Sequence, residues 1–172
     1  MAERIGVSLG VDVGRARVGL AASDPDGLMA NPVMTLSRDA KKRRDQRIIA
    51  NIAEERGARR VFVGLPLNLK GEHTPSTDDA VEYAEDLAAR LAEVGQECDV
   101  LLIDERLTTV TAQNALREAG ISARDQRKMI DQAAAVAILE HALTGLRQRG
   151  EAGEPVAARQ NTPGPSREEE RA

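Results

Sequence analysis

Three carboxylates stand where separate buried segments of this chain should begin or end. Asp12 closes an apolar strand, Glu105 closes another, and Asp131 opens an apolar helix. A buried carboxylate is costly unless something positive holds it. Acids that converge from separate segments therefore suggest a site for a divalent cation, and this constellation is the main clue to function.

Asp12 belongs to a strand whose residues alternate between two faces. It shares its face with Ser8 and Gly10, at the carboxyl end where open sheets usually bind ligands. Because Gly10 has no side chain, we expect room beside Asp12 for a ligand or a metal ion. The alternative is that Asp12 only begins the turn at Gly14.

Asp104 and Glu105 are neighbours in an extended segment, so their side chains point to opposite faces. Only one of the two can share a cleft with Asp12, and the strand register that would decide between them is unknown. The alternative for either is an ion pair with Arg106 or another nearby cation.

Asp131 lies on a helix face that should pack inward. Ala134, Ala135 and Ile138 follow it at the spacing of one apolar helical stripe. The alternative is that Asp131 only stabilises the positive end of the helix, as acids in a first turn commonly do.

Carboxylates held together in this way match the chemistry of Mg²⁺ or Mn²⁺, which prefer oxygen ligands and keep several waters. Around one or two such ions, carboxylates make a site for phosphodiester hydrolysis. Arg124, Arg127 and Lys128, just before Asp131, would then bind flanking phosphates. These cations, like the run of four at residues 41–44, can also be read as a solvated surface.

Composition excludes several classes of protein. The net charge of −4 gives no global basic field, and with one Phe, one Tyr and no Trp the chain is unsuited to stacking successive bases. A single cysteine, Cys98, excludes an internal disulfide and a Cys-rich zinc site, and two histidines are too few for a His-based one. Without a signal peptide or a membrane-length apolar run, a soluble cytoplasmic protein is expected.

Hydrophobic alternation predicts five strands and, between them, helices. The predicted strands are residues 4–13, 17–23, 32–36, 60–64 and 99–105, with a hairpin turn at Gly14 and Arg15. The meander of three strands, followed by alternating helices and strands, predicts an α/β fold with a mixed sheet and helices on both faces.

Capping residues and apolar spacing locate the helices. The first should run from Asp39 to Arg56, with Ile48, Ile49 and Ile52 inward, and Gly57 just beyond its end.

The second should be capped by Ser76 or Thr77, and the third should run from Thr108 or Thr109 to Gly120. The last spans residues 130–145, or begins earlier if Ser122 and Asp125 form a capping box.

The chain divides into a folded domain at residues 1–146 and a tail at residues 147–172. The tail is rich in Gly, Pro, Arg and Glu and lacks apolar periodicity, so we expect it to be disordered.

Four segments resemble the YqgF family, in the family's order and over roughly residues 4–145. They read LGVDVGRARVGLAASD (residues 9–24), VFVGLPLNLKGE (61–72), DERLTTVTAQ (104–113) and IDQAAAVAILEHAL (130–143). Members of that family are described as nucleases for the 5′ end of pre-16S rRNA and as Holliday junction resolvases. The resemblance implies a ribonuclease H-like fold.

The resemblance also assigns residues. The family's acidic triad maps onto Asp12, Glu105 and Asp131 as catalytic and metal-binding residues, which favours Glu105 over Asp104. Arg17 and Asn68 match family positions that could contact substrate. Where many members carry Lys, this chain has Ala16, which removes one phosphate contact that Arg15 could replace.

The sequence leaves several functions open. The leading one is a metal-dependent nuclease, using Mg²⁺ or Mn²⁺, that matures pre-16S rRNA in ribosome biogenesis and meets ribosomal precursor particles. The alternatives are a Holliday junction resolvase acting on four-way DNA and a non-catalytic RNA- or ribosome-binding module.

A phosphotransferase of the actin type is a weaker reading, because one domain of this length cannot enclose a nucleotide. The protein could be a monomer or a homodimer, and a resolvase would need two active sites in a symmetric dimer.

Overall fold

A computed structural model describes residues 4–105 and 122–156. Its centre is one six-stranded sheet with the strand order β3-β2-β1-β4-β5-β6. The strands are β1 (Ser8–Val13), β2 (Arg17–Ser23), β3 (Ala30–Ser37), β4 (Arg60–Leu65), β5 (Asp99–Asp104) and β6 (Glu154–Pro155).

Strand directions bring several strand ends to one edge. β2 is antiparallel to both β1 and β3, whereas β4 is parallel to both β1 and β5. β1, β3, β4 and β5 therefore all end at the same edge, where β2 begins. We call it the carboxyl edge, the position at which open α/β sheets usually bind ligands.

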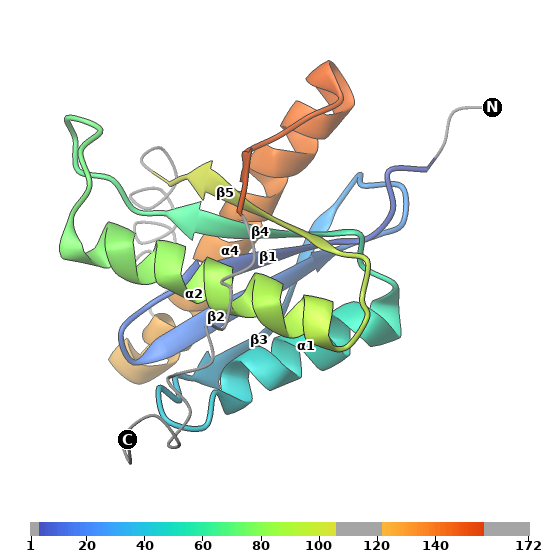
Figure 1. Ribbon diagram of the computed structural model, residues 1–172. Coiled ribbons are helices and arrows are strands. Elements are labelled where there is room, and N and C mark those ends of the chain that lie inside the picture. The colour runs from blue at the N-terminus through green and yellow to red at the C-terminus, as the bar shows by residue number, and fades with distance from the viewer. Residues whose placement is uncertain (1–3, 106–121, 157–172) are drawn as a thin grey trace, which may run out of the picture.

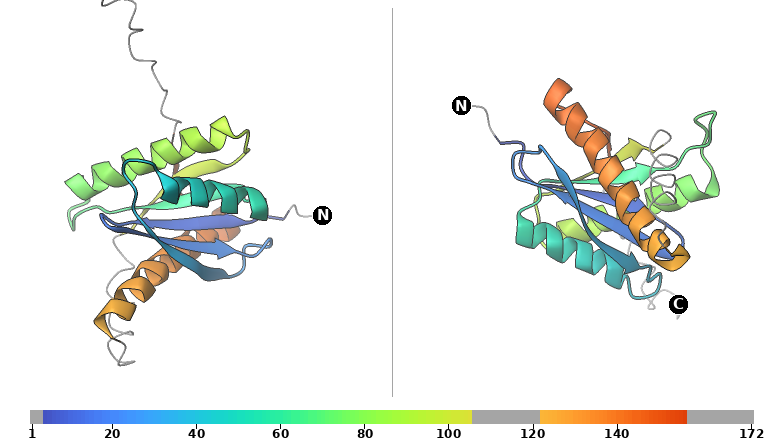
Figure 2. Two further views of the ribbon diagram at one scale, coloured as in Figure 1. Left: turned by 90° about the horizontal axis from the view of Figure 1, so that it is seen from below. Right: turned by 180° about the vertical axis from the view of Figure 1, so that it is seen from behind.

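Helices cover both faces of this sheet (Figures 1 and 2). α1 (Arg44–Arg56) and α2 (Pro75–Glu93) pack on one face, and α4 (Ala123–Arg149) crosses the other. The predicted mixed sheet with helices on both faces is confirmed. Within the described ranges, no helix has both the length and the apolar run needed to cross a bilayer.

The alternation in β1 separates the two cores. Leu9 and Val11 are fully buried in the core under α1 and α2, together with Ile49 of α1 and Leu87 of α2. The other face of the sheet packs against α4 through a second core that contains Phe62. Asp12 belongs to the α4 face because side chains alternate along a strand.

The predicted strands are confirmed with small shifts of their ends. β2 has the predicted bounds, β3 is longer at both ends, and β5 ends one residue early at Asp104. β1 begins at Ser8 rather than residue 4, because Gly6 adopts a φ of 85° that is incompatible with a strand.

α1 begins later than predicted. Asp39 does not cap it but accepts hydrogen bonds from the amides two and three residues further on, at 3.2 and 3.0 Å, which closes a separate turn. Arg43 then takes a left-handed conformation (φ 52°), and the helix starts at Arg44. Gly57 ends it in the left-handed conformation, as predicted.

Two other predictions for α1 and α2 were wrong. Ile48 is 38% exposed, unlike its buried neighbour Ile49, because one helical face cannot include two consecutive residues fully. The cap of α2 is Thr74, which accepts a hydrogen bond from the amide of Thr77, rather than Ser76 or Thr77 itself. Pro75 suits the first helical position, so the cap falls one residue before it.

α4 begins early, at Ala123, because Ser122 accepts a hydrogen bond from the amide of Asp125 at 3.4 Å. The helix continues to Arg149, and β6 then pairs antiparallel with β5. The folded structure therefore continues beyond residue 146, where the sequence analysis ended the domain. The helix predicted at residues 108–120 lies outside the described residues, as do residues 157–172.

Candidate acidic site at the carboxyl edge

Asp12 and Glu105 meet at the carboxyl edge and share a side-chain hydrogen bond. Burial, this hydrogen bond, and the charges of Glu105 and Asp131 together raise the pKa of Asp12 to about 9. At neutral pH without a cation, this raised pKa favours the protonated form of Asp12. The structure thus brings all three predicted acids into electrostatic contact.

Glu105 reaches Asp12 across the intervening strand β4. Its amide donates to the carbonyl of Leu65 at the end of β4, at 3.2 Å. A Cβ atom at Gly64 would lie 3.2 Å from the Glu105 carboxylate, so the absence of a side chain there leaves space for that carboxylate. Asp104 is exposed instead, so of these two neighbours it is Glu105 that lies beside Asp12.

Asp131 reaches the site because α4 packs directly onto β2. Asp12 pairs in register with Gly19, and a Cβ atom at Gly19 would stand 2.0 Å from the carbonyl oxygen of Asp131. The helix backbone can approach the sheet this closely only over a glycine. This contact sets Asp131 beside the strand that carries Asp12.

The space beside Gly10 is filled by α4 and not, as was predicted from the sequence, by a ligand or metal ion. A Cβ atom there would lie 2.6 Å from the carbonyl oxygen of Ala135 and 2.8 Å from the Cβ of Leu139. The backbone and side chains of α4 therefore pack directly against Gly10. Gly10 therefore serves helix packing.

Arg17 holds the Asp131 carboxylate. Its Nε donates to Oδ2 of Asp131 at 2.7 Å, and the two side chains are 36% and 17% exposed. Arg17 stands in the β1–β2 hairpin, which is closed by a hydrogen bond of 2.9 Å from the Gly14 amide to the Arg17 carbonyl. The hairpin predicted at Gly14 is thus confirmed, and it places a guanidinium at the edge of the acidic site.

The donor atoms of this site fit a hard divalent cation. Asp12 and Glu105 offer carboxylate oxygens side by side, which are the ligands that Mg²⁺ and Mn²⁺ prefer. In the described parts of the chain, however, no three His, Cys, Asp or Glu side chains already form a metal-binding group. Asp131 is instead engaged with Arg17.

Asn68 shapes the loop that follows β4. Its Oδ1 accepts hydrogen bonds from the amides of Lys70 and Glu72 at 3.0 and 2.8 Å, and its Nδ2 donates to Glu72 Oε2 at 3.2 Å. In this arrangement the Asn68 side chain stabilises the loop at the carboxyl edge.

The basic residues before Asp131 lie in the first turns of α4. Arg127 and Lys128 have exposed side chains, and the carbonyl of Lys128 accepts a hydrogen bond from Thr35 on β3 at 3.1 Å. The side chain of Arg124 lies outside the described residues.

Two kinds of position that help to build the site were not predicted from the sequence. Gly19 and Gly64 stand inside strands, which is a known sign of close approach by another backbone or side chain. Arg38 joins the β1–β2 hairpin to α2, since its Nη1 donates to the Gly14 carbonyl at 3.0 Å and its two terminal nitrogens bind Asp79 at 2.5 and 2.7 Å. No sequence pattern indicated this bridge.

Comparison with solved structures gives the same fold. The chain matches a structure of Thermus thermophilus RuvC with a TM-score of 0.52 at 18% identity, covering 87% of this chain and 99% of that one. A structure of T. thermophilus RuvC in complex with a Holliday junction substrate matches with a TM-score of 0.53 at 19% identity, covering 88% and 99%.

Sequence relatives are much more similar. A protein of Mycobacteroides abscessus named "Putative pre-16S rRNA nuclease" is 51% identical over 149 residues, which cover 87% of each chain. A protein of Clavibacter sepedonicus with the same name is 52% identical over 147 residues, covering 86% of this chain and 88% of that one.

A family model described as RuvX, Holliday junction resolvase, matches residues 6–145, which include the strands β1–β5 and the three acids. This chain therefore belongs to the RuvX (YqgF) family.

Proposed function

We propose that this chain is a metal-dependent nuclease that hydrolyses phosphodiester bonds in the 5′-end maturation of pre-16S rRNA. The observation that carries the proposal is the hydrogen-bonded carboxyl pair of Asp12 and Glu105, with Asp131 beside it at the carboxyl edge. The names of relatives about half identical to this chain support the RNA substrate. Such work on ribosomal precursors would take place in the cytoplasm.

The acids have distinct roles in this proposal. Asp12 and Glu105 would hold Mg²⁺ or Mn²⁺, and Asp131 would complete the site once its contact with Arg17 loosens or is bridged by water. A bound ion would supply an activated water and offset charge on the phosphate, and we favour the two-ion form of this chemistry. Arg17 orients Asp131 and balances part of the negative charge.

The remaining assigned residues would bind substrate. Arg17, Asn68, Arg124, Arg127 and Lys128 stand in the β1–β2 hairpin, the loop after β4 and the first turns of α4. These segments adjoin the strand ends that carry the acids. Cations there can hold the flanking phosphates while the acids hold the ion.

A second candidate, resolution of four-way DNA junctions, is supported by the description of the family model. An acidic site of this kind can act on either nucleic acid. Paired cuts in a junction would require two copies of the chain in a symmetric dimer.

The test compares cleavage of pre-16S rRNA carrying its 5′ extension with cleavage of a four-way DNA junction. Each is incubated with Mg²⁺ or Mn²⁺ and with wild type, Asp12→Asn or Asp99→Asn. Asp99 begins β5, at the opposite end of the strand that leads to Glu105, and it is exposed, so it provides a matched control.

We expect cation-dependent cleavage of the rRNA by wild type and by Asp99→Asn, and a loss of at least about a thousandfold for Asp12→Asn, as expected when a metal-binding catalytic group is removed. Unchanged cleavage by Asp12→Asn would overturn the assignment of the site. Binding of the rRNA without cleavage under any metal condition would instead identify a non-catalytic module, and preference for the junction would favour the second candidate.

A further inference from the structure

Apart from Arg43, which pairs with Asp86, four exposed cations gather between the end of β3 and the second turn of α1. They are Lys41, Lys42, Arg44 and Arg47, which we call the basic turn. In the described part of the chain, the one ion pair within this group is that of Arg44 with Asp39, at 3.8 Å between exposed or half-exposed side chains. Such a pair contributes little, so the positive charge of the basic turn is nearly uncompensated.

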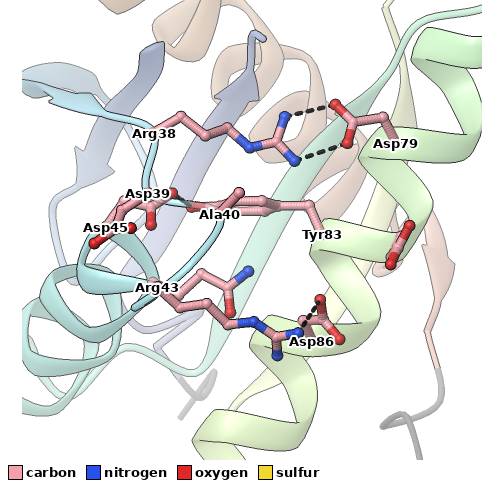
Figure 3. A pocket seen from close by; sticks show the side chains of 10 residues that line it. Arg38, Asp39, Ala40, Arg43, Asp45, Asp79, Tyr83 and Asp86 are labelled. Carbon is pink, nitrogen blue, oxygen red and sulfur yellow. Dashed lines mark hydrogen bonds and ion pairs between the residues drawn. The ribbon is translucent and has the colours of Figure 1, made fainter. Parts of the chain in front are cut away.

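The two acids of the same segment, Asp39 and Asp45, are already engaged in hydrogen bonds. Asp39 accepts hydrogen bonds from the amides of its own turn, at 3.2 and 3.0 Å, which lowers its pKa. Asp45, in the first turn of α1, is only 2% exposed and accepts a hydrogen bond from the Tyr83 hydroxyl at 2.8 Å. Figure 3 shows Asp39, Asp45 and Tyr83 lining the pocket behind the basic turn.

Acids on α2 are likewise engaged in this pocket (Figure 3). Asp79 binds both terminal nitrogens of Arg38, which also lies 5.1 Å from the centre of the Tyr83 ring. Asp86 pairs with Arg43 at 3.5 Å. These carboxylates therefore line the pocket, whereas the cations of the basic turn are exposed to solvent.

The basic turn lies at the carboxyl edge, beside the hairpin that carries Arg17. β3 ends at this edge, and the turn follows it directly. The amide of Arg38 donates to the Ala16 carbonyl at 2.9 Å, and Arg38 Nη1 donates to the Gly14 carbonyl at 3.0 Å. In Figures 1 and 2 the hairpin, the segment before α1 and the start of α4 lie at the same end of the sheet.

We propose that the basic turn is a second phosphate-binding surface, on which the nucleic acid backbone lies after crossing the β1–β2 hairpin from the acidic site. This inference rests on the proposed function and extends it, because it defines the direction in which a long substrate leaves the acids. The ligand is the phosphodiester backbone, whether RNA or DNA, since contacts from lysine and arginine side chains to phosphates carry no sequence information.

The test measures equilibrium binding in a chelator, so that cleavage does not interfere. Wild type, Lys41→Gln/Lys42→Gln and Arg44→Gln/Arg47→Gln are titrated with duplex RNA, single-stranded RNA and a four-way DNA junction over a range of salt. The control is Arg56→Gln/Arg59→Gln, which removes the same charge from exposed residues at and beyond the opposite end of α1. Circular dichroism and melting establish that each variant is folded.

Each double variant of the basic turn should bind roughly tenfold more weakly near 0.1 M salt, with a log–log salt slope reduced by about 1.4 to 1.8, as two lost phosphate contacts imply. The control should retain most of the wild-type affinity and slope. Equal losses in the control, or no loss in either variant of the basic turn, would overturn the proposal.

The binding result is independent of catalysis. If wild type fails to cleave any substrate but the variants of the basic turn lose affinity and slope, the proposed nuclease is wrong and the binding surface stands. If wild type cleaves while those variants bind as tightly as wild type does, the proposed nuclease stands and the second binding surface is wrong. Comparison of the RNA and DNA arms reports which backbone this surface prefers.

Discussion

At the scale of single residues, Asp12 combines functional value with a cost in stability. Its half-buried carboxyl group lies beside Glu105 and Asp131, and this environment raises its pKa to about 9 from an ordinary value of 3.8. A fold that only needed stability would place an uncharged side chain here. The proposed nuclease function explains why three acids are kept together.

Replacing Asp12 with Asn should therefore stabilise the metal-free protein. The folded state binds the Asp12 proton more tightly than the unfolded state does, so wild type loses stability as pH rises from about 4 toward 9. Asn cannot ionise, and the gain should be larger at pH 8 than at pH 5. A gain of about 1 kcal/mol would raise the melting temperature by about 2–4 °C.

Thermal melting in a chelator at the two pH values measures this effect, with Asp99→Asn as the control. If Asp12→Asn melts at a lower temperature than wild type at pH 8, the Asp12 carboxylate is not destabilised by its burial and by the charges of Glu105 and Asp131. The same outcome would also weaken its assignment to a cation site.

At the scale of elements, three glycines of the sheet decide where α4 and Glu105 lie. Gly10 and Gly19 admit the α4 backbone, and Gly64 leaves space for the carboxylate of Glu105. Because α4 carries Asp131, the packing of this helix and the geometry of the acidic site cannot be separated. A helix displaced from β2 would take Asp131 away from Asp12.

Gly19→Ala should therefore damage stability and activity together. Its new Cβ atom would stand 2.0 Å from the Asp131 carbonyl oxygen, so α4 must shift, at a cost of about 1–3 kcal/mol or more. Gly10→Ala meets α4 at 2.6 Å, further along the helix, and should disturb the site less.

Melting temperature and cleavage rate, measured on both variants, test this ranking. An equal loss of activity in the two variants at equal stability would contradict it, because only Gly19 contacts the residue that carries the carboxylate.

At the scale of the whole molecule, charge is distributed unevenly. The chain has a net charge of −4, yet the carboxyl edge carries the basic turn, Arg17 and the exposed Arg127 and Lys128 around a small acidic centre. This arrangement suits a protein that binds a polyanion at one edge and a divalent cation at the centre of that edge. The net charge of the chain does not indicate this local distribution.

Divalent cation binding should be visible in global stability. At a concentration about a hundred times the dissociation constant, a cation that binds only the folded state adds about 2.7 kcal/mol. Mg²⁺ or Mn²⁺ should thus raise the melting temperature of wild type by about 5–10 °C. Differential scanning fluorimetry with and without each cation measures this shift.

Asp12→Asn and Asp99→Asn provide the comparison, because the first removes a proposed ligand and the second does not. A shift of the same size in Asp12→Asn as in wild type would place the bound cation elsewhere. The absence of any shift in wild type would contradict the proposed metal site.

Much of this protein is determined locally by its sequence. The alternation of β1, the bounds of β2, the Gly14 hairpin and the Gly57 helix end follow from side-chain periodicity and from the backbone freedom of glycine, which act over a few residues. Four family motifs further indicated which acids belong together. Local signals were weaker where two nearby residues could both cap a helix, as Thr74 and Ser76 could at the start of α2.

Tertiary structure determines the contacts between segments that are distant in the sequence. Only packing shows that α4 fills the space at Gly10, that Gly64 leaves space for Glu105, and that Asp131 binds Arg17, 114 residues away. Such contacts depend on strand register and on how closely a helix approaches a sheet, and no short window of sequence encodes either quantity. The three acids could therefore be proposed from the sequence, whereas their arrangement came from the fold.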